Sequence, residues 1–131
     1  MPDLMTPAEL HVVREFLGLD MDDLARILGN SERTVRRWAA GSTQIPDGTR
    51  LDIEALEDHT AAFVGSIIDA LNNDLDLTDS PVLVYRTDAE YWTHHPEQRP
   101  YPASWHRAVV ARVAQEVPGL SITYAHGAEE D

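Results

Sequence analysis

The feature that most constrains the fold is residues 20–41, DMDDLARILGNSERTVRRWAAG, in which two short helical patterns are separated by a glycine. Ser31 is a good N-terminal cap for the second pattern, and Gly41 follows its last apolar residues. Gly29 at the turn tolerates a positive φ, and Ala25 is small enough for the second helix to cross closely over the first. This spacing predicts a helix-turn-helix.

The two sides of the second helix follow from the same spacing. The residues expected to hold the helices together are Leu24, Leu28, Val35 and Trp38. Those left facing outward are Glu32, Arg33, Arg36 and Arg37, for which a solvated helix face is the alternative to a binding site. Such a helix enters the major groove of DNA, where arginine pairs bidentately with guanine. We therefore predict base contacts for Arg33 and Arg37. For Glu32 we expect either a hydrogen bond from cytosine N4 or a negative charge that favours the helix dipole at the start of the helix. For Arg36 we expect either a phosphate contact or an ion pair with Glu32, one turn earlier.

These residues resemble the helix-turn-helix of the Cro/CI-type (XRE) repressors. The positions that match, at that family's spacing and without a gap, are Leu24, Ala25, Leu28, Gly29, Ser31, Thr34, Val35, Trp38 and Gly41. One departure is Met21, because the family usually has a phosphate-contacting glutamine at the first position of the helix before the turn. The resemblance implies base contacts at Arg33 and Arg37. Its phosphate-contacting positions correspond to Ser31, Thr34, Thr43 and Gln44, for which capping or loop solvation is the alternative. Arg50 is a further candidate for phosphate contact.

The rest of the chain predicts a mainly α protein, α+β overall. Capping boxes at Thr6 and Thr87 each open a helix, and one long helix is expected over residues 47–71, with Gly65 as the place where it would break. A further helix is expected around Trp105. Short strands are expected at Val82–Tyr85 and Leu120–Tyr124, the second of them half-buried.

The expected organisation is two domains. Residues 1–72 form a helix-turn-helix DNA-binding domain with a long fourth helix, and residues 73–131 form a small α+β dimerisation domain with an acidic tail. Residues 74–80 are acidic and polar, as in a linker. Pro96, Pro100 and Pro102 are expected to exclude regular structure between them.

Charge is distributed unevenly along the chain. The net charge is −13, and all ten cationic residues are arginines. Residues 1–50 carry six arginines against eight acidic residues, whereas residues 51–131 carry four against fifteen. This acidity argues against a protein that coats nucleic acid non-specifically. It does not exclude a site-specific DNA binder, because only the field at the contact surface matters.

Several classes of function are excluded. The chain has no cysteine, which rules out disulfides, thiolate nucleophiles and Cys-ligated zinc and fits a reducing cytoplasm. Apolar runs fall far short of the ~20 residues of a membrane span. No nucleophile elbow or phosphate loop is present, so we expect neither an enzyme nor a cofactor. His94, His95 and Glu97 lack a further ligand at a set spacing, and no metal site is predicted.

A single recognition helix contacts too few base pairs to define a genomic site. The sequence therefore favours a homodimer on a palindromic operator, with its two recognition helices roughly 34 Å apart. The two short strands make a poor sheet alone, and pairing with each other or with the mate would cover their edges. The apolar stripe of residues 53–71 is another candidate contact. The residues predicted for the core or the dimer interface of the second half are Val82, Val84, Tyr85, Tyr91, Trp92, Trp105, Ile122 and Tyr124.

The wider sequence resembles the anti-CRISPR-associated repressors, which pair such a DNA-binding domain with a small dimerisation domain. The shared segments are Ile45-Pro46-Asp47, the residues Asp88, Glu90, Tyr91, His95 and Pro96, and Trp105-His106-Arg107. The resemblance implies autoregulatory repression from an inverted-repeat operator. An antitoxin that also grips a toxin, a lysogeny-type phage repressor and a protein-interaction module without DNA binding remain alternatives. Binding of structured RNA by the same surface stays open.

Overall fold

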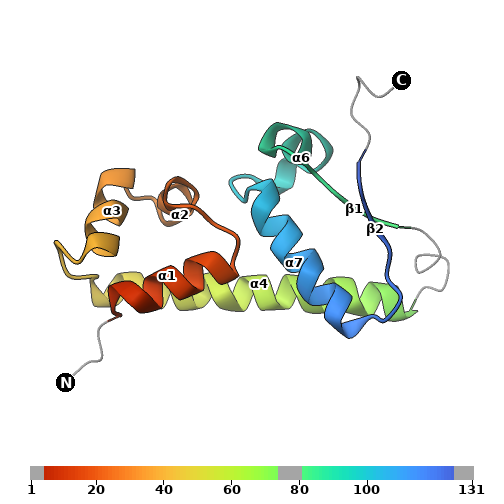
Figure 1. Ribbon diagram of the computed structural model, residues 1–131, viewed down its shortest axis with the longest axis horizontal. Coiled ribbons are helices and arrows are strands. Elements are labelled where there is room, and N and C mark those ends of the chain that lie inside the picture. Colours follow the sequence, from red (N-terminus) through yellow and green to blue (C-terminus); the bar gives the residue numbers. More distant parts are fainter. Residues whose placement is uncertain (1–4, 74–80, 126–131) are drawn as a thin grey trace. The chain divides into compact units, whose positions relative to one another are not determined.

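The computed structural model describes residues 5–73 and 81–125, which are mainly helical with one two-stranded sheet (Figure 1). This confirms the predicted fold class. The elements are α1 (Pro7–Phe16), α2 (Met21–Leu28), α3 (Glu32–Ala40), α4 (Asp47–Asn73), β1 (Val82–Val84), α6 (Asp88–His94), the 3-10 turn η1 (Pro96–Gln98), α7 (Ala103–Glu116) and β2 (Ile122–Tyr124). The expected linker at residues 74–80 and most of the acidic tail lie outside the described residues.

The chain divides within α4 into two compact units, Met1–Thr60 (unit 1) and Ala61–Asp131 (unit 2). The sequence-based division at residues 72 and 73 lies instead at the end of this helix. α4 contributes residues to both units because it continues through Gly65 without a break. A glycine inside a helix costs about 1 kcal/mol relative to alanine, which is too little to interrupt a helix that buries Val64 directly before it.

The helices of unit 1 begin and end where their local sequence dictates. Capping boxes open α1 and α2: the side chain of Thr6 accepts from the Glu9 N–H at 3.1 Å, and that of Asp20 accepts from the Asp23 N–H at 2.7 Å. Gly29, with φ of 75°, lets the chain leave α2 in the left-handed conformation that L side chains avoid. Residues 20–41 therefore form two helices, α2 and α3, joined by a tight turn, as the sequence predicts for a helix-turn-helix.

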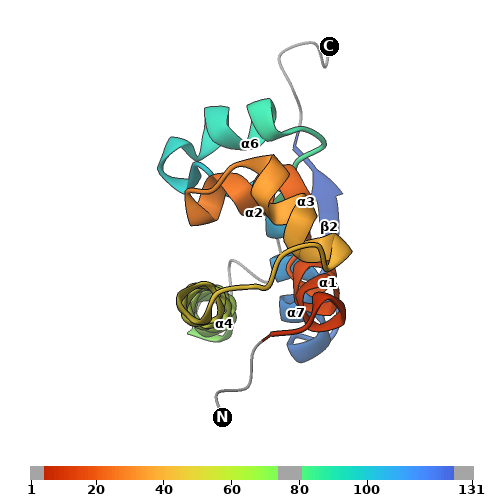
Figure 2. The ribbon, with the colours of Figure 1, turned by 90° about the vertical axis from the view of Figure 1, so that its left-hand side faces the viewer.

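The core of unit 1 holds α3 against its neighbours. α3 contacts both α1 and α2, and Figure 2 shows it beside these two helices. Leu24, Val35 and Trp38 are buried, as predicted, whereas Leu28 is half-buried. The other large buried side chains of this unit include Leu10, Leu17, Leu19, Ile45 and Ile53. One side of α3 is thereby anchored, and its opposite side faces outward.

Unit 2 is built around a parallel pair of strands. β1 and β2 pair in register Val82 with Ile122 and Val84 with Tyr124, and α6, η1 and α7 form the connection between them. Trp105 of α7 is fully buried and stacks on Phe63, with ring centroids 5.3 Å apart. The expectation of no regular structure from Pro96 to Pro102 was wrong in one detail, because η1 lies there: proline suits the first position of a helical turn.

The second strand differs from its predicted burial. Alternation predicted a half-buried strand, yet all three residues of β2 are exposed, Ile122 by 44% and Tyr124 by 40%. A two-stranded sheet has two edges, and β2 lies at one of them. The alternation of apolar and polar residues therefore predicts the strand itself correctly. Burial of the apolar side chains of β2 would require a second layer over the strand, which the described residues of this single chain do not supply.

A buried histidine in unit 2 makes stability depend on pH. His106 is buried, and its Nδ1 has no hydrogen-bond partner among the described residues. Desolvation lowers its pKa to about 4, and the charges of His95 and Arg107 act in the same direction. Above the ordinary histidine pKa both folded and unfolded chains hold a neutral imidazole, so stability is unaffected there. As the pH falls below about 6.5, the His106 imidazole binds a proton in the unfolded chain but stays neutral in the folded chain. The free energy of unfolding therefore decreases.

We expect this group alone to lower the free energy of unfolding by about 2 kcal/mol between pH 7 and pH 5. Urea unfolding at a series of pH values measures it. His106→Phe removes the titrating group and should flatten the dependence in this range. An unchanged slope in that variant would show that other groups cause the acid sensitivity.

Candidate nucleic-acid interface

The orientation of α3 is determined by its cap and by its buried side. The Ser31 hydroxyl accepts from the Thr34 N–H at 3.1 Å and lies 2.9 Å from the Thr34 hydroxyl. Gly41, with φ of 77°, ends the helix. Because Val35 and Trp38 are buried on the inner side, the arginines between them are directed outward. The exposed face of this helix is therefore set by contacts on its other side.

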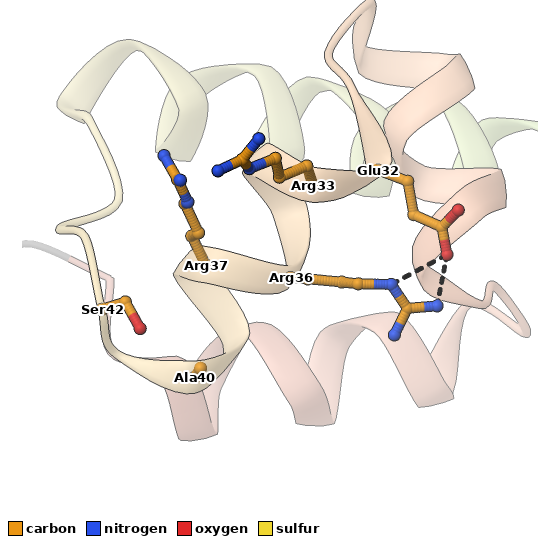
Figure 3. Close-up of a pocket in the computed structure, with 6 residues that line it drawn as sticks. All are labelled: Glu32, Arg33, Arg36, Arg37, Ala40 and Ser42. Atoms are coloured by element: carbon orange, nitrogen blue, oxygen red, sulfur yellow. Dashed lines mark hydrogen bonds and ion pairs between the residues drawn. The ribbon is translucent and has the colours of Figure 1, made fainter.

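The outward face of α3 lines a shallow depression of about 410 Å³ (Figure 3). Its lining residues are Glu32, Arg33, Arg36, Arg37, Ala40 and Ser42. Arg33 and Arg37 are exposed and extend on the same side of the helix. Within residues 5–73 and 81–125 neither of these two guanidinium groups has an ion-pair or hydrogen-bond partner. Two such forks side by side, with no carboxylate between them, are suited to base edges or phosphates.

Arg36 differs from its two neighbours. Its Nε donates to the Glu32 carboxylate at 2.9 Å, and its Nη2 donates to the same oxygen (Figure 3). Of the two roles predicted for Arg36, the bond back to Glu32 is therefore present in the free protein. Glu32 also lies in the first turn of α3, where a negative charge favours the helix dipole.

The predicted phosphate-contacting residues fall into two groups. The hydroxyls of Ser31 and Thr34 already serve the cap of α3. Thr43 and Gln44 are exposed and line a second depression of about 390 Å³. Its other lining residues are Met5, Thr6, Pro7, Gly41 and Ile45. The positions of Met5, Thr6 and Pro7 beside this loop could not be predicted from the sequence, because only the tertiary fold brings the start of α1 there.

Arg50 and Arg26 are held by carboxylates within their own helices. Arg50 lies 3.4 Å from Glu54 in α4. Arg26 lies 2.7 Å from Asp22 and 2.6 Å from Asp23, both one turn earlier in α2. The sequence carried the signal for these pairs, because residues three and four apart are neighbours on a helix. Arg14 of α1 is half-buried and donates to the Leu19 carbonyl oxygen. Among the described residues of unit 1, the exposed arginines without a carboxylate partner are therefore Arg33 and Arg37 of α3.

The residues predicted for dimerisation separate into buried and accessible sets. Val84, Tyr85, Tyr91 and Trp105 are buried within unit 2 itself. Ile122 and Tyr124 are exposed, and Val82 and Trp92 are half-buried. Leu83, which was not predicted as a dimerisation residue, is also exposed. The Arg86 guanidinium lies 3.9 Å from the centre of the Tyr124 ring. The accessible apolar surface of this unit thus includes the β strands.

The paired histidines belong to an aromatic cluster beside β1. His95 Nε2 lies 3.1 Å from the Tyr85 hydroxyl, and the His94 ring lies 5.3 Å from the Tyr85 ring. Burial raises the pKa of the Tyr85 and Tyr91 hydroxyls, which keeps both neutral. In the described ranges no group of three or more histidine and acidic side chains is arranged to hold a metal ion. The same ranges contain no helix with the length and apolarity to cross a membrane.

Comparison with known proteins identifies a family to which the sequence is similar. No curated protein matches the sequence. The model of the Aca2/YdiL-like family, by contrast, matches residues 5–119. The matched region contains the helix-turn-helix, α4 and unit 2 as far as the end of α7, and it ends before β2. This is consistent with the resemblance to anti-CRISPR-associated regulators. Since the match covers most of its length, the chain belongs to the Aca2/YdiL-like family.

Proposed function

We propose that the protein is a sequence-specific DNA-binding transcriptional repressor of the anti-CRISPR-associated type. The observation that carries this proposal is the pair Arg33 and Arg37, exposed and without charge partners in the described residues, on the outward face of a capped and anchored helix. A helix with these dimensions fits the major groove, and two arginine forks on it can each pair with a guanine. The resemblance to the anti-CRISPR-associated repressors further suggests that the protein represses its own promoter.

The charge distribution supports specific rather than general DNA binding. The half of the chain after residue 50 carries an excess of eleven negative charges, which repels phosphate. The first half is nearly balanced, and among its described residues Arg33 and Arg37 of α3 are the exposed arginines without a carboxylate partner. We therefore expect weak binding to unrelated DNA and operator binding that falls steeply with salt.

We propose further that the repressor acts as a homodimer, held by unit 2. The edge strand β2 gives a strongly acidic unit two exposed apolar side chains on one face of its sheet, Ile122 and Tyr124, with the Arg86 guanidinium beside the Tyr124 ring. Covering such a strand with a second copy would remove an unpaired edge, which proteins generally avoid exposing. Two copies would also place two recognition helices on one operator.

Selection of bound duplexes from a random DNA library tests the function directly. We expect an enriched inverted repeat whose half-sites lie one helical turn apart, roughly 34 Å. A reporter under the chain's own promoter should then be repressed by the protein and released when the repeat is scrambled. Failure to enrich any sequence would refute DNA-specific binding, and enrichment of a single half-site would refute the symmetric dimer.

Light scattering with size exclusion tests the dimer surface. We expect a dimer at micromolar concentration and a monomer for Ile122→Asp, because a carboxylate cannot be buried unpaired in an apolar interface. Val12→Asp is the matched control, since Val12 is equally apolar, more exposed and in unit 1. A dimer that survives Ile122→Asp, or one that Val12→Asp also breaks, would contradict the assignment to the strand surface.

A further inference from the structure

We propose that Glu32 is a specificity-determining residue that withholds Arg36 from DNA phosphates. This inference rests on the proposed DNA-binding function and deepens it. Three arginines lie on the outward face of α3, yet only Arg36 has a carboxylate partner among the described residues of that face. The pair is therefore a selective feature of one arginine and not a general neutralisation of the helix.

The geometry holds the pair in a defined arrangement. Nε and Nη2 of Arg36 both donate to the same Glu32 oxygen, so one edge of the guanidinium fork is occupied. Glutamate four residues before arginine is the favourable order on a helix. Glu32 is further stabilised by the positive end of the α3 dipole, directly after the Ser31 cap. In Figure 3 Arg36 is directed to Glu32, whereas Arg33 and Arg37 extend away from that carboxylate.

The consequence for binding concerns unrelated DNA most. A free exposed arginine binds any phosphate, and each such contact adds affinity without sequence information. Glu32 prevents this in two ways, because it occupies Arg36 and because its own charge repels phosphate. Only DNA that offers the carboxylate a donor, such as the exocyclic amine of cytosine, avoids that penalty. The specificity ratio therefore depends on Glu32 even though the residue adds little to total affinity.

The test compares Glu32→Gln with the parent on two duplexes of equal length, the selected operator and a scrambled sequence. We expect the variant to bind the scrambled duplex about five- to tenfold more tightly, with a salt slope steeper by about one per protomer. Operator affinity should change by less than that gain, so the ratio of the two affinities falls. Glu15→Gln is the matched control, because it removes one exposed carboxylate from α1 and leaves α3 unchanged.

A second substitution assigns the effect to Arg36. In the parent background Arg36→Gln should have little effect on scrambled DNA, whereas in the Glu32→Gln background it should remove the larger part of the gain and leave the part that comes from the lost negative charge. Equal gains for Glu15→Gln and Glu32→Gln, or a gain of undiminished size without Arg36, would overturn the role of Glu32. So would loss of operator binding by Glu32→Gln with no gain on scrambled DNA. A parent protein that selects no sequence at all would instead refute the proposed function.

Discussion

Replacing both Arg33 and Arg37 with alanine is expected to weaken operator binding by about 100-fold or more, each substitution costing about 1–3 kcal/mol. The physical reason is that each guanidinium offers a two-pronged donor to one guanine or phosphate. Neither fork is occupied by another described residue, so the substitutions remove binding groups without breaking internal contacts. Titration of a labelled operator by fluorescence anisotropy measures the loss.

The fold should survive these changes, because both side chains are exposed and alanine favours helix. Circular dichroism and unfolding curves verify this point. Arg99→Ala is a suitable control, since it removes one exposed positive charge from unit 2, where its only described ring contact is with Trp92. If the α3 double variant bound the operator as tightly as the parent, the recognition helix would have to be sought elsewhere.

Trp105→Ala is expected to lower the free energy of unfolding by about 3–5 kcal/mol. Trp105 is fully buried, and its ring stacks on Tyr101 at 4.4 Å and on Phe63 at 5.3 Å. Truncation leaves a cavity between these two rings and removes the stacking of α7 on Phe63 of α4. A loss of this size is a large fraction of the 5–15 kcal/mol that stabilises a typical domain. Urea unfolding followed by circular dichroism gives the change.

The conservative variant Trp105→Phe retains an aromatic ring between Phe63 and Tyr101 and should cost less than half as much. If unit 2 holds the dimer, Trp105→Ala should also shift the light-scattering mass toward the monomer at low concentration. A change in unfolding free energy below about 1 kcal/mol would mean that the site collapses without leaving a cavity.

Local features of the chain were predicted well from the sequence. The caps at Thr6, Ser31 and Thr87 all occur where expected, because a cap depends only on residues three positions apart. The outward position of the α3 arginines was predictable for a similar reason. Helical periodicity assigns one side to the core once Val35 and Trp38 are recognised as buried.

Choices between two local alternatives were not predictable. Arg36 had either a phosphate or Glu32 as its partner, and both are compatible with the same spacing. Tyr91 and Ile122 were both assigned to the core or the dimer interface, yet Tyr91 is buried and Ile122 is exposed. Apolar character predicts burial but does not specify which surface provides it.

The sequence by itself therefore determined the helix-turn-helix, the caps and the clustering of three arginines on one short helix, since each follows from the order of residues within a few helical turns. Only the tertiary structure decided which aromatic residues build unit 2, that β1 and β2 pair in parallel, and that the start of α1 lies beside Thr43 and Gln44. These outcomes depend on residues tens of positions apart, such as Phe63 and Trp105, whose contact no local pattern encodes.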